Sequence, residues 1–176
     1  MKFENKKAVY RIDLRKVEEV SSTFSTERGI EMIKENGRIF AFMVEYILPW
    51  VFENVEKSAS TETDLIADKS IKIEVKTTVK DEKGVDIGVS GMTGKGRFYD
   101  RKLHLAKILF NDYYAIVDKS VLPMMDVYVI PSEEIHDFLD ENIPTINAGK
   151  IKNTAKIKHW DNFKNLFREE DFIYAK

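Results

Sequence analysis

A glutamate and a lysine two positions apart are the residues of this sequence whose types and spacing best suit chemistry. Glu74 and Lys76 lie in the segment 71–78, in which apolar or β-branched residues alternate strictly with polar ones. This alternation predicts a β-strand, so both side chains are expected on one face while Val75 points to the other. A carboxylate and an amine would then be held side by side on a rigid element.

A second carboxylate is expected to meet this pair. Asp64 precedes a short apolar run that predicts another strand, and a turn is expected at residues 68–70. A hairpin would bring Asp64 close to Glu74. Two converging carboxylates suit Mg²⁺, with Mn²⁺ as a substitute, and the carbonyl oxygen of Val75 is a further candidate ligand.

Such an ion lowers the pKa of a bound water, which Lys76 can position or help to deprotonate, and this chemistry predicts phosphodiester hydrolysis. The spacing of Asp64, Glu74 and Lys76 also arises in solvent-facing strands of charged proteins, so the pattern by itself leaves a non-catalytic interpretation open.

Hydrophobic periodicity predicts the elements around this group. A long helix or helix pair should begin after Thr26, with breaks at Gly37 and Pro49. Further helices are expected at 98–109, at 131–139 with Ser132 as N-cap, and at 161–167, and further strands at 113–117 and 127–130. Residues 8–20 fit either a helix or an edge segment. The order predicts an α/β fold with a central mixed β-sheet flanked by helices.

The order of elements, with D-L-I-A at 64–67 and I-K-I-E-V-K-T-T at 71–78, resembles the core of the PD-(D/E)xK nuclease superfamily. Within it the chain is most similar to small type II restriction endonucleases of the PvuII kind, over residues 61–157 and including I-N-A-G-K-I at 146–151. The resemblance implies a restriction-endonuclease-like core, Asp64 and Glu74 as metal ligands and Lys76 as the catalytic lysine. It also implies DNA contacts at Asn147 and Lys150.

The chain departs from the superfamily pattern at two places. Thr63 stands where the motif has proline, and residues 90–95 contain no counterpart of the histidines that read bases in the related enzymes. A shared recognition sequence therefore does not follow.

An acid within the long apolar helix is a further candidate for the site. Glu45 stands alone in the otherwise apolar stretch 39–48. In many members of the superfamily a helix acid joins the metal site, and Glu45 is a candidate for that catalytic role. A charge at an interface explains it as well. Glu62, just before Asp64, is a further candidate for the same role, with less support than Glu45.

Basic residues gather in two segments of a chain whose formal net charge is −2. Residues 95–107 contain a single acid, and residues 143–160 contain none. Both segments suit contact with phosphates, although solvated surface is the alternative interpretation. The predicted DNA-binding residues are Lys95, Arg97, Asn147, Lys150, Lys152, Lys156, Lys158 and His159.

With 176 residues, 43% of them hydrophobic, the chain is expected to form one domain. Its predicted parts are a mainly helical, dimerising segment 1–57, a catalytic core 58–142 and a basic DNA-contacting tail 143–176. The absence of cysteine, a charged N-terminus and an apolar run at 39–52 too short for a bilayer favour a cytoplasmic protein without a membrane span.

The leading hypothesis is a Mg²⁺-dependent, type II-like restriction endonuclease that acts on double-stranded DNA. A homodimer is expected because each subunit would offer one active site for two strands. A Holliday junction resolvase or nicking nuclease with the same residues, and a non-catalytic DNA-binding domain, are the alternatives.

Overall fold

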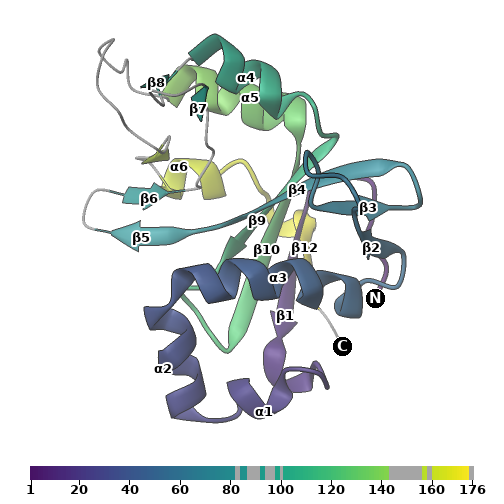
Figure 1. The fold of residues 1–176 in the computed structure, drawn as a ribbon, viewed down its shortest axis with the longest axis vertical. Coiled ribbons are helices and arrows are strands. Elements are labelled where there is room, and N and C mark those ends of the chain that lie inside the picture. Colours follow the sequence, from purple (N-terminus) through teal and green to yellow (C-terminus); the bar gives the residue numbers. More distant parts are fainter. Residues whose placement is uncertain are drawn as a thin grey trace.

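The computed structural model describes residues 1–81, 84–86, 92–93, 98–99, 101–142, 156–157 and 160–174 (Figure 1). The main-sheet strands are β1 (Ala8–Asp13), β2 (Val55–Lys57), β3 (Leu65–Ala67), β4 (Ile71–Thr77), β9 (Tyr113–Asp118), β10 (Met124–Pro131) and β12 (Phe172–Tyr174). The α-helices are α1 (Ser21–Phe24), α2 (Glu27–Glu35), α3 (Gly37–Val51), α4 (Arg101–Ile108), α5 (Ser132–Asn142) and α6 (Trp160–Lys164), and the short 3-10 helices are η1 (Leu14–Lys16) and η2 (Glu169–Asp171).

The main sheet has seven strands in the order β12-β1-β10-β9-β4-β3-β2. β4 pairs parallel with β9 and β1 pairs parallel with β12, whereas the other neighbours are antiparallel. The fold is therefore α/β with a mixed sheet, which confirms the sequence prediction at that level. A three-stranded sheet joins β11 (Lys156–Ile157), β6 (Gly84–Asp86) and β5 (Val79–Asp81), and a two-stranded sheet joins β7 (Met92–Thr93) and β8 (Phe98–Tyr99).

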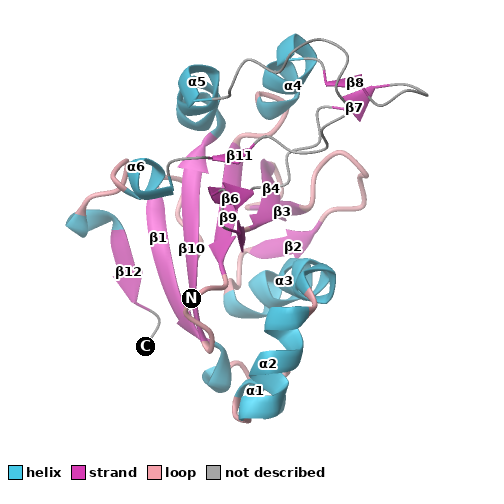
Figure 2. Cartoon of the chain, turned by 90° about the vertical axis from the view of Figure 1, so that its left-hand side faces the viewer, coloured by secondary structure: helices cyan, strands magenta, loops and turns pink. Residues whose placement is uncertain are grey.

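Helices cover both faces of the main sheet. On one face, Ile33 of α2 and Ile47 of α3 are buried in a cluster that includes Ile73 of β4. On the other face, Ile135 of α5 and Phe163 of α6 belong to a separate cluster, with residues of β9 and β10. Figure 2 shows α4 and α5 at one end of the molecule and α1 and α2 at the other. The alternation of side chains along the strands produces these two cores.

Several expected helices occur with changed boundaries. Thr26 is the N-cap of α2 as predicted, because its side chain accepts a hydrogen bond from the N–H of Gly29. The break predicted at Gly37 separates α2 from α3, whereas Pro49 lies inside α3. The expected N-cap role of Ser132 is wrong: its Oγ is buried and has no hydrogen-bond partner among the described residues.

Two segments differ from the sequence prediction. Residues 1–57 are mainly helical, with α1 to α3, but they also contain β1 and β2, which the sequence prediction did not include and which belong to the main sheet. β1 lies in the stretch 8–20 that hydrophobic periodicity left open, and it pairs with β10 inside the sheet. The helix expected to begin at residue 98 begins at Arg101 instead, after β8.

Candidate active site

The hairpin of β3 and β4 sets the relative position of Asp64 and Glu74. Its strands pair antiparallel with Leu65 opposite Ile73, so the next step along the ladder places Asp64 opposite Glu74. The turn lies at residues 68–70, where the sequence predicts it. Residues directly opposite each other in such a ladder have Cβ atoms about 4.5–5.5 Å apart and share one face of the sheet.

Hydrogen bonds and ion pairs hold three side chains together on this face. The Oδ2 atom of Asp64 accepts a hydrogen bond from the N–H of Val75 at 2.8 Å. The amine of Lys76 contacts Oε1 of Glu74 and lies 4.0 Å from Oδ2 of Asp64. The side chains of Asp64, Glu74 and Lys76 are 28%, 19% and 19% exposed. Two carboxylates and one amine therefore converge in a largely sheltered position.

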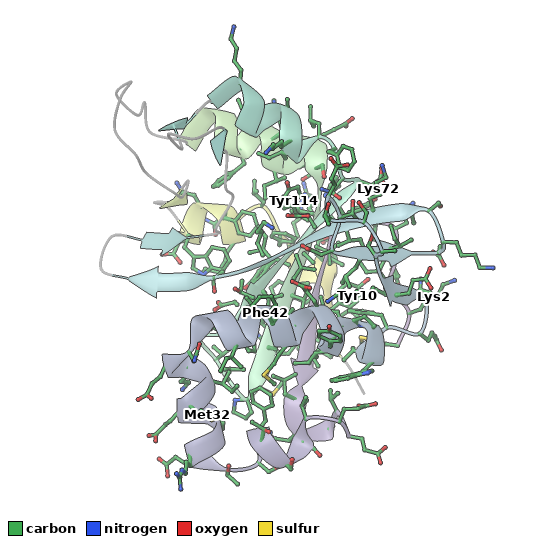
Figure 3. All side chains as sticks on the ribbon, viewed as in Figure 1. Lys2, Tyr10, Met32, Phe42, Lys72 and Tyr114 are labelled. Atoms are coloured by element: carbon green, nitrogen blue, oxygen red, sulfur yellow. The ribbon has the colours of Figure 1, made fainter. Side chains whose placement is uncertain are left out.

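Tyr114 lies beside this group because β4 and β9 run parallel with Glu74 paired to Tyr114. Its side chain is almost fully buried. Burial, followed by the nearby carboxylates of Glu74 and Asp64, raises the pKa of the Tyr114 phenol. Figure 3 places Tyr114 and Lys72 in the upper part of the sheet, close to α4 and α5. The phenol therefore adds a protonated hydroxyl to the surroundings of the two carboxylates at neutral pH.

A cleft of about 420 Å³ opens at Glu74 and Lys76. Its other walls come from the segment before β3, from β9 and from the end of α4 with the following loop. These parts contribute Thr61, Glu62, Ala106, Lys107, Phe110, Asn111 and Tyr114. Both signs of charge thus face one cavity, which is the arrangement that a phosphate and a cation require together. Sequence analysis included Lys107 in a basic segment suited to phosphates but did not identify Phe110, Asn111 or Tyr114 as site residues.

A buried hydrogen bond fixes the segment that leads into Asp64. The hydroxyl of Thr63 donates to Oδ1 of Asn111 at 2.8 Å, and both residues are buried. The loop that carries Asn111 is tied to β4, since the carboxylate of Asp112 accepts a hydrogen bond from the N–H of Lys72 at 2.8 Å. Thr63 thus connects the two walls of the cleft.

The structure does not bring Glu45 to this group. Its carboxylate pairs with the amine of Lys57 at 3.0 Å. Lys57 and Val55 are two positions apart on β2 and so point to one face of the sheet, where Val55 is buried in the same core as residues of α3. Ile73 belongs to that core as well, and Glu74, the next residue, points to the opposite face. Glu45 therefore lies on the other side of the sheet from the two carboxylates.

Most of the predicted DNA-binding residues lie outside the described residues: Lys95, Arg97, Asn147, Lys150, Lys152, Lys158 and His159. Lys156 belongs to β11, which pairs antiparallel with β6. Their role in DNA binding stays a prediction.

The donor set of the site fits Mg²⁺, which takes oxygen ligands and retains several waters. Oδ2 of Asp64 accepts a hydrogen bond from the N–H of Val75 and Oε1 of Glu74 contacts the amine of Lys76, and each carboxylate has further lone pairs that could bind a cation. Within the described ranges no group of three or more His, Cys, Asp or Glu side chains could hold a metal. The assignment of Asp64, Glu74 and the carbonyl of Val75 as ligands stays a prediction.

The charge balance of the site leads to a prediction for the metal-free protein. Burial raises the pKa of the Glu74 carboxyl; Lys76 partly offsets this effect, and Asp64 adds to it. Because the folded-state pKa is raised, the contribution of Glu74 to stability is full below the ordinary glutamate pKa and is lost as the pH rises through the folded-state value.

We expect the stability of the wild type, relative to the Glu74→Gln variant, to fall as the pH rises from about 4 toward neutrality. Thermal unfolding of both proteins in EDTA across this range measures the difference. If the difference in stability between the two proteins is constant or rises with pH, the carboxyl of Glu74 is not in the buried position beside Asp64 described above.

Comparison of the chain with models of protein families, with curated proteins and with solved structures finds no match. Within the described residues, no helix has the length and apolar character needed to cross a membrane. The geometry of the site is therefore the main basis for a functional assignment.

Proposed function

We propose that this protein is a divalent-metal-dependent endodeoxyribonuclease with a restriction-endonuclease-like core of the PD-(D/E)xK type. One observation carries the proposal: the carboxylates of Asp64 and Glu74 and the amine of Lys76 converge on one sheet face, where Glu74 and Lys76 line a cleft. Two acids against one amine also leave an excess of negative charge, which a divalent cation offsets.

The residues of the chain divide the work of hydrolysis. Mg²⁺ held by Asp64 and Glu74 would supply Lewis-acid chemistry, lowering the pKa of a bound water and offsetting charge on the phosphate. Lys76, beside both carboxylates, orients the attacking water and assists its loss of a proton. The water oxygen forms a bond to phosphorus while its proton passes to solvent, one P–O ester bond breaks, and the leaving oxygen takes up a proton from a neighbouring water. Lys107, in the same cleft, provides a cation for a non-bridging phosphate oxygen.

We further propose double-stranded DNA as the substrate and a homodimer as the active form, as in a type II-like restriction endonuclease. The exposed face of α3 supports a dimer contact. Ile39, Phe42, Tyr46 and Trp50 follow one another at helical spacing and are 43%, 66%, 50% and 47% exposed. A continuous apolar stripe of this kind is characteristic of surfaces that another protein covers.

Incubation of plasmid DNA with the purified protein tests the function and the dimer together. In Mg²⁺ we expect linear DNA and discrete fragments without accumulation of nicked circles, since a dimer offers one active site to each strand. EDTA should abolish the reaction. Nicked circles, or cleavage of four-way junctions alone, favour the nicking or junction-resolving alternative. DNA binding without hydrolysis in Mg²⁺ or Mn²⁺ contradicts the nuclease and favours a non-catalytic binding domain.

A further inference from the structure

An exposed aromatic ring lies in the proposed active-site cleft. Phe110 follows α4, where its N–H donates to the carbonyl of Lys107, and it lines the same cavity as Glu74 and Lys76. Phe110 is 44% exposed. Single exposed apolar side chains are common on protein surfaces, but Phe110 is exposed inside a cleft lined by charged groups, where its ring is available to a ligand.

The ring is held in place from the side of the sheet. The amine of Lys72 lies 4.4 Å from the centroid of the Phe110 ring, a cation–π contact. Lys72, Glu74 and Lys76 alternate along β4 and so point to one face of the strand. Phe110 therefore extends over the same sheet face that carries the proposed catalytic group.

The rest of the cleft indicates what the ring would contact. Lys76 and Lys107 supply amines for a phosphate, while the ring of Phe110 supplies an apolar, planar surface. A phosphate linked to a planar aromatic group describes a nucleotide whose base is not stacked in a duplex. The volume of the cleft, about 420 Å³, suits a small chemical group rather than a protein segment.

We infer that Phe110 is a stacking platform for one unstacked nucleobase next to the cleaved phosphate. This inference rests on the proposed function, because it takes the strand being cleaved as the ligand. It implies that the double-stranded substrate has one base displaced from its stack at the cleaved step. Stacking of a base on an aromatic side chain contributes about 1–3 kcal/mol.

Binding of two oligonucleotides that differ only in their bases tests the platform. A short oligothymidylate and an abasic oligonucleotide of equal length carry the same phosphates. Both are titrated, by fluorescence anisotropy, against proteins with Asp64→Asn, which prevents cleavage. We expect Phe110→Ala to weaken oligothymidylate binding about 5- to 150-fold, the equivalent of the stacking contribution, and to leave abasic binding unchanged. Phe110→Trp should retain the binding of both.

Leu109→Ala is the matched control. Leu109 is the adjacent residue, is 50% exposed, and lines a different cavity, so its truncation should change neither titration. Thermal unfolding verifies that each variant is folded. Equal weakening of both oligonucleotides by Phe110→Ala, or no weakening of either, overturns the platform. Loss of base-dependent binding in Phe110→Ala, together with plasmid cleavage by the wild type, would support the platform and the nuclease separately. If the wild type cleaves no DNA, but Phe110→Ala weakens only the binding of the oligothymidylate, the nuclease is rejected and the platform is retained.

Discussion

Replacement of Lys76 by alanine is expected to slow DNA cleavage by about 10²- to 10⁴-fold, the usual contribution of a positioned proton-transferring group. The amine of Lys76 contacts Glu74 and lies 4.0 Å from Oδ2 of Asp64, so it is placed to orient a water between the carboxylates and a phosphate. Alanine removes the amine and leaves the strand intact. Initial rates of plasmid cleavage in Mg²⁺ measure the loss.

Asp64→Asn should lower the rate at least as strongly, because the variant loses the charge that would attract the metal. The asparagine oxygen can still accept the hydrogen bond from Val75, so the local fold should persist.

Glu45 and Lys57 provide the matched control for both variants. They form an ion pair at 3.0 Å on the opposite face of the sheet. Glu45→Gln and Lys57→Ala should leave the cleavage rate within about twofold, since exposed pairs contribute about 1 kcal/mol or less even to stability. If Lys76→Ala and Asp64→Asn leave cleavage unchanged, the assigned active site is wrong. A large loss in Glu45→Gln would instead place the helix acid in the reaction.

The central hairpin could be predicted because its information is local. The alternation along 71–78 defines the face of each side chain, and the turn at 68–70 fixes the register that brings Asp64 opposite Glu74. Both features depend on residues within about one hairpin of each other. The helix N-cap at Thr26 could be identified for the same reason.

The ends of the sheet could not be predicted, because they depend on contacts between distant parts of the chain. β12 pairs with β1, so the last strand of the chain joins the first. A short strand such as Phe172–Tyr174 carries too few residues for a periodic signal. The segment 8–20 stayed ambiguous because the partner of β1 is β10, more than a hundred residues away.

The walls of the cleft were missed for a related reason. Tyr114 belongs to a strand that is buried at most positions, so its sequence resembles an ordinary core strand. Its place beside Glu74 follows from the parallel pairing of β4 with β9, two strands that are not consecutive in the chain. Glu45 illustrates the opposite error: helical spacing shows that it lies among apolar residues, but the docking of α3 decides which face of the sheet it reaches.

A row of charges across three strands gives the largest expected effect on stability. The pairing of β1, β10 and β9 aligns Arg11 with Asp126, and Asp126 with Asp118. Asp126 and Asp118 are 4% and 8% exposed. Like charges that face each other across neighbouring strands destabilise a sheet, so these acids require hydrogen bonds or a cation.

Arg11 supplies that cation. Its Nε and Nη2 donate to the two oxygens of Asp126 at 2.7 and 2.6 Å, and the hydrogen bond to Asp126 raises the pKa of Arg11 above its usual value. Asp118 depends on other donors, since its Oδ1 accepts from the N–H of Ser120 at 2.8 Å and from the hydroxyl of Thr78 at 3.5 Å. Asp126 is therefore the acid that Arg11 neutralises directly.

We expect Arg11→Met to lower the free energy of unfolding by about 3 kcal/mol, the lower end of the range for a broken buried pair, because Arg11 is itself 38% exposed and partly screened by water. Methionine retains an apolar stem but leaves Asp126 charged and unpaired. Urea unfolding at neutral pH measures the change. Addition of Asp126→Asn should recover much of the loss, since the amide removes the buried charge, and a double-mutant cycle separates the pairing energy from packing. A loss below about 1 kcal/mol, or a double variant no more stable than Arg11→Met, would mean that water rather than Arg11 compensates Asp126.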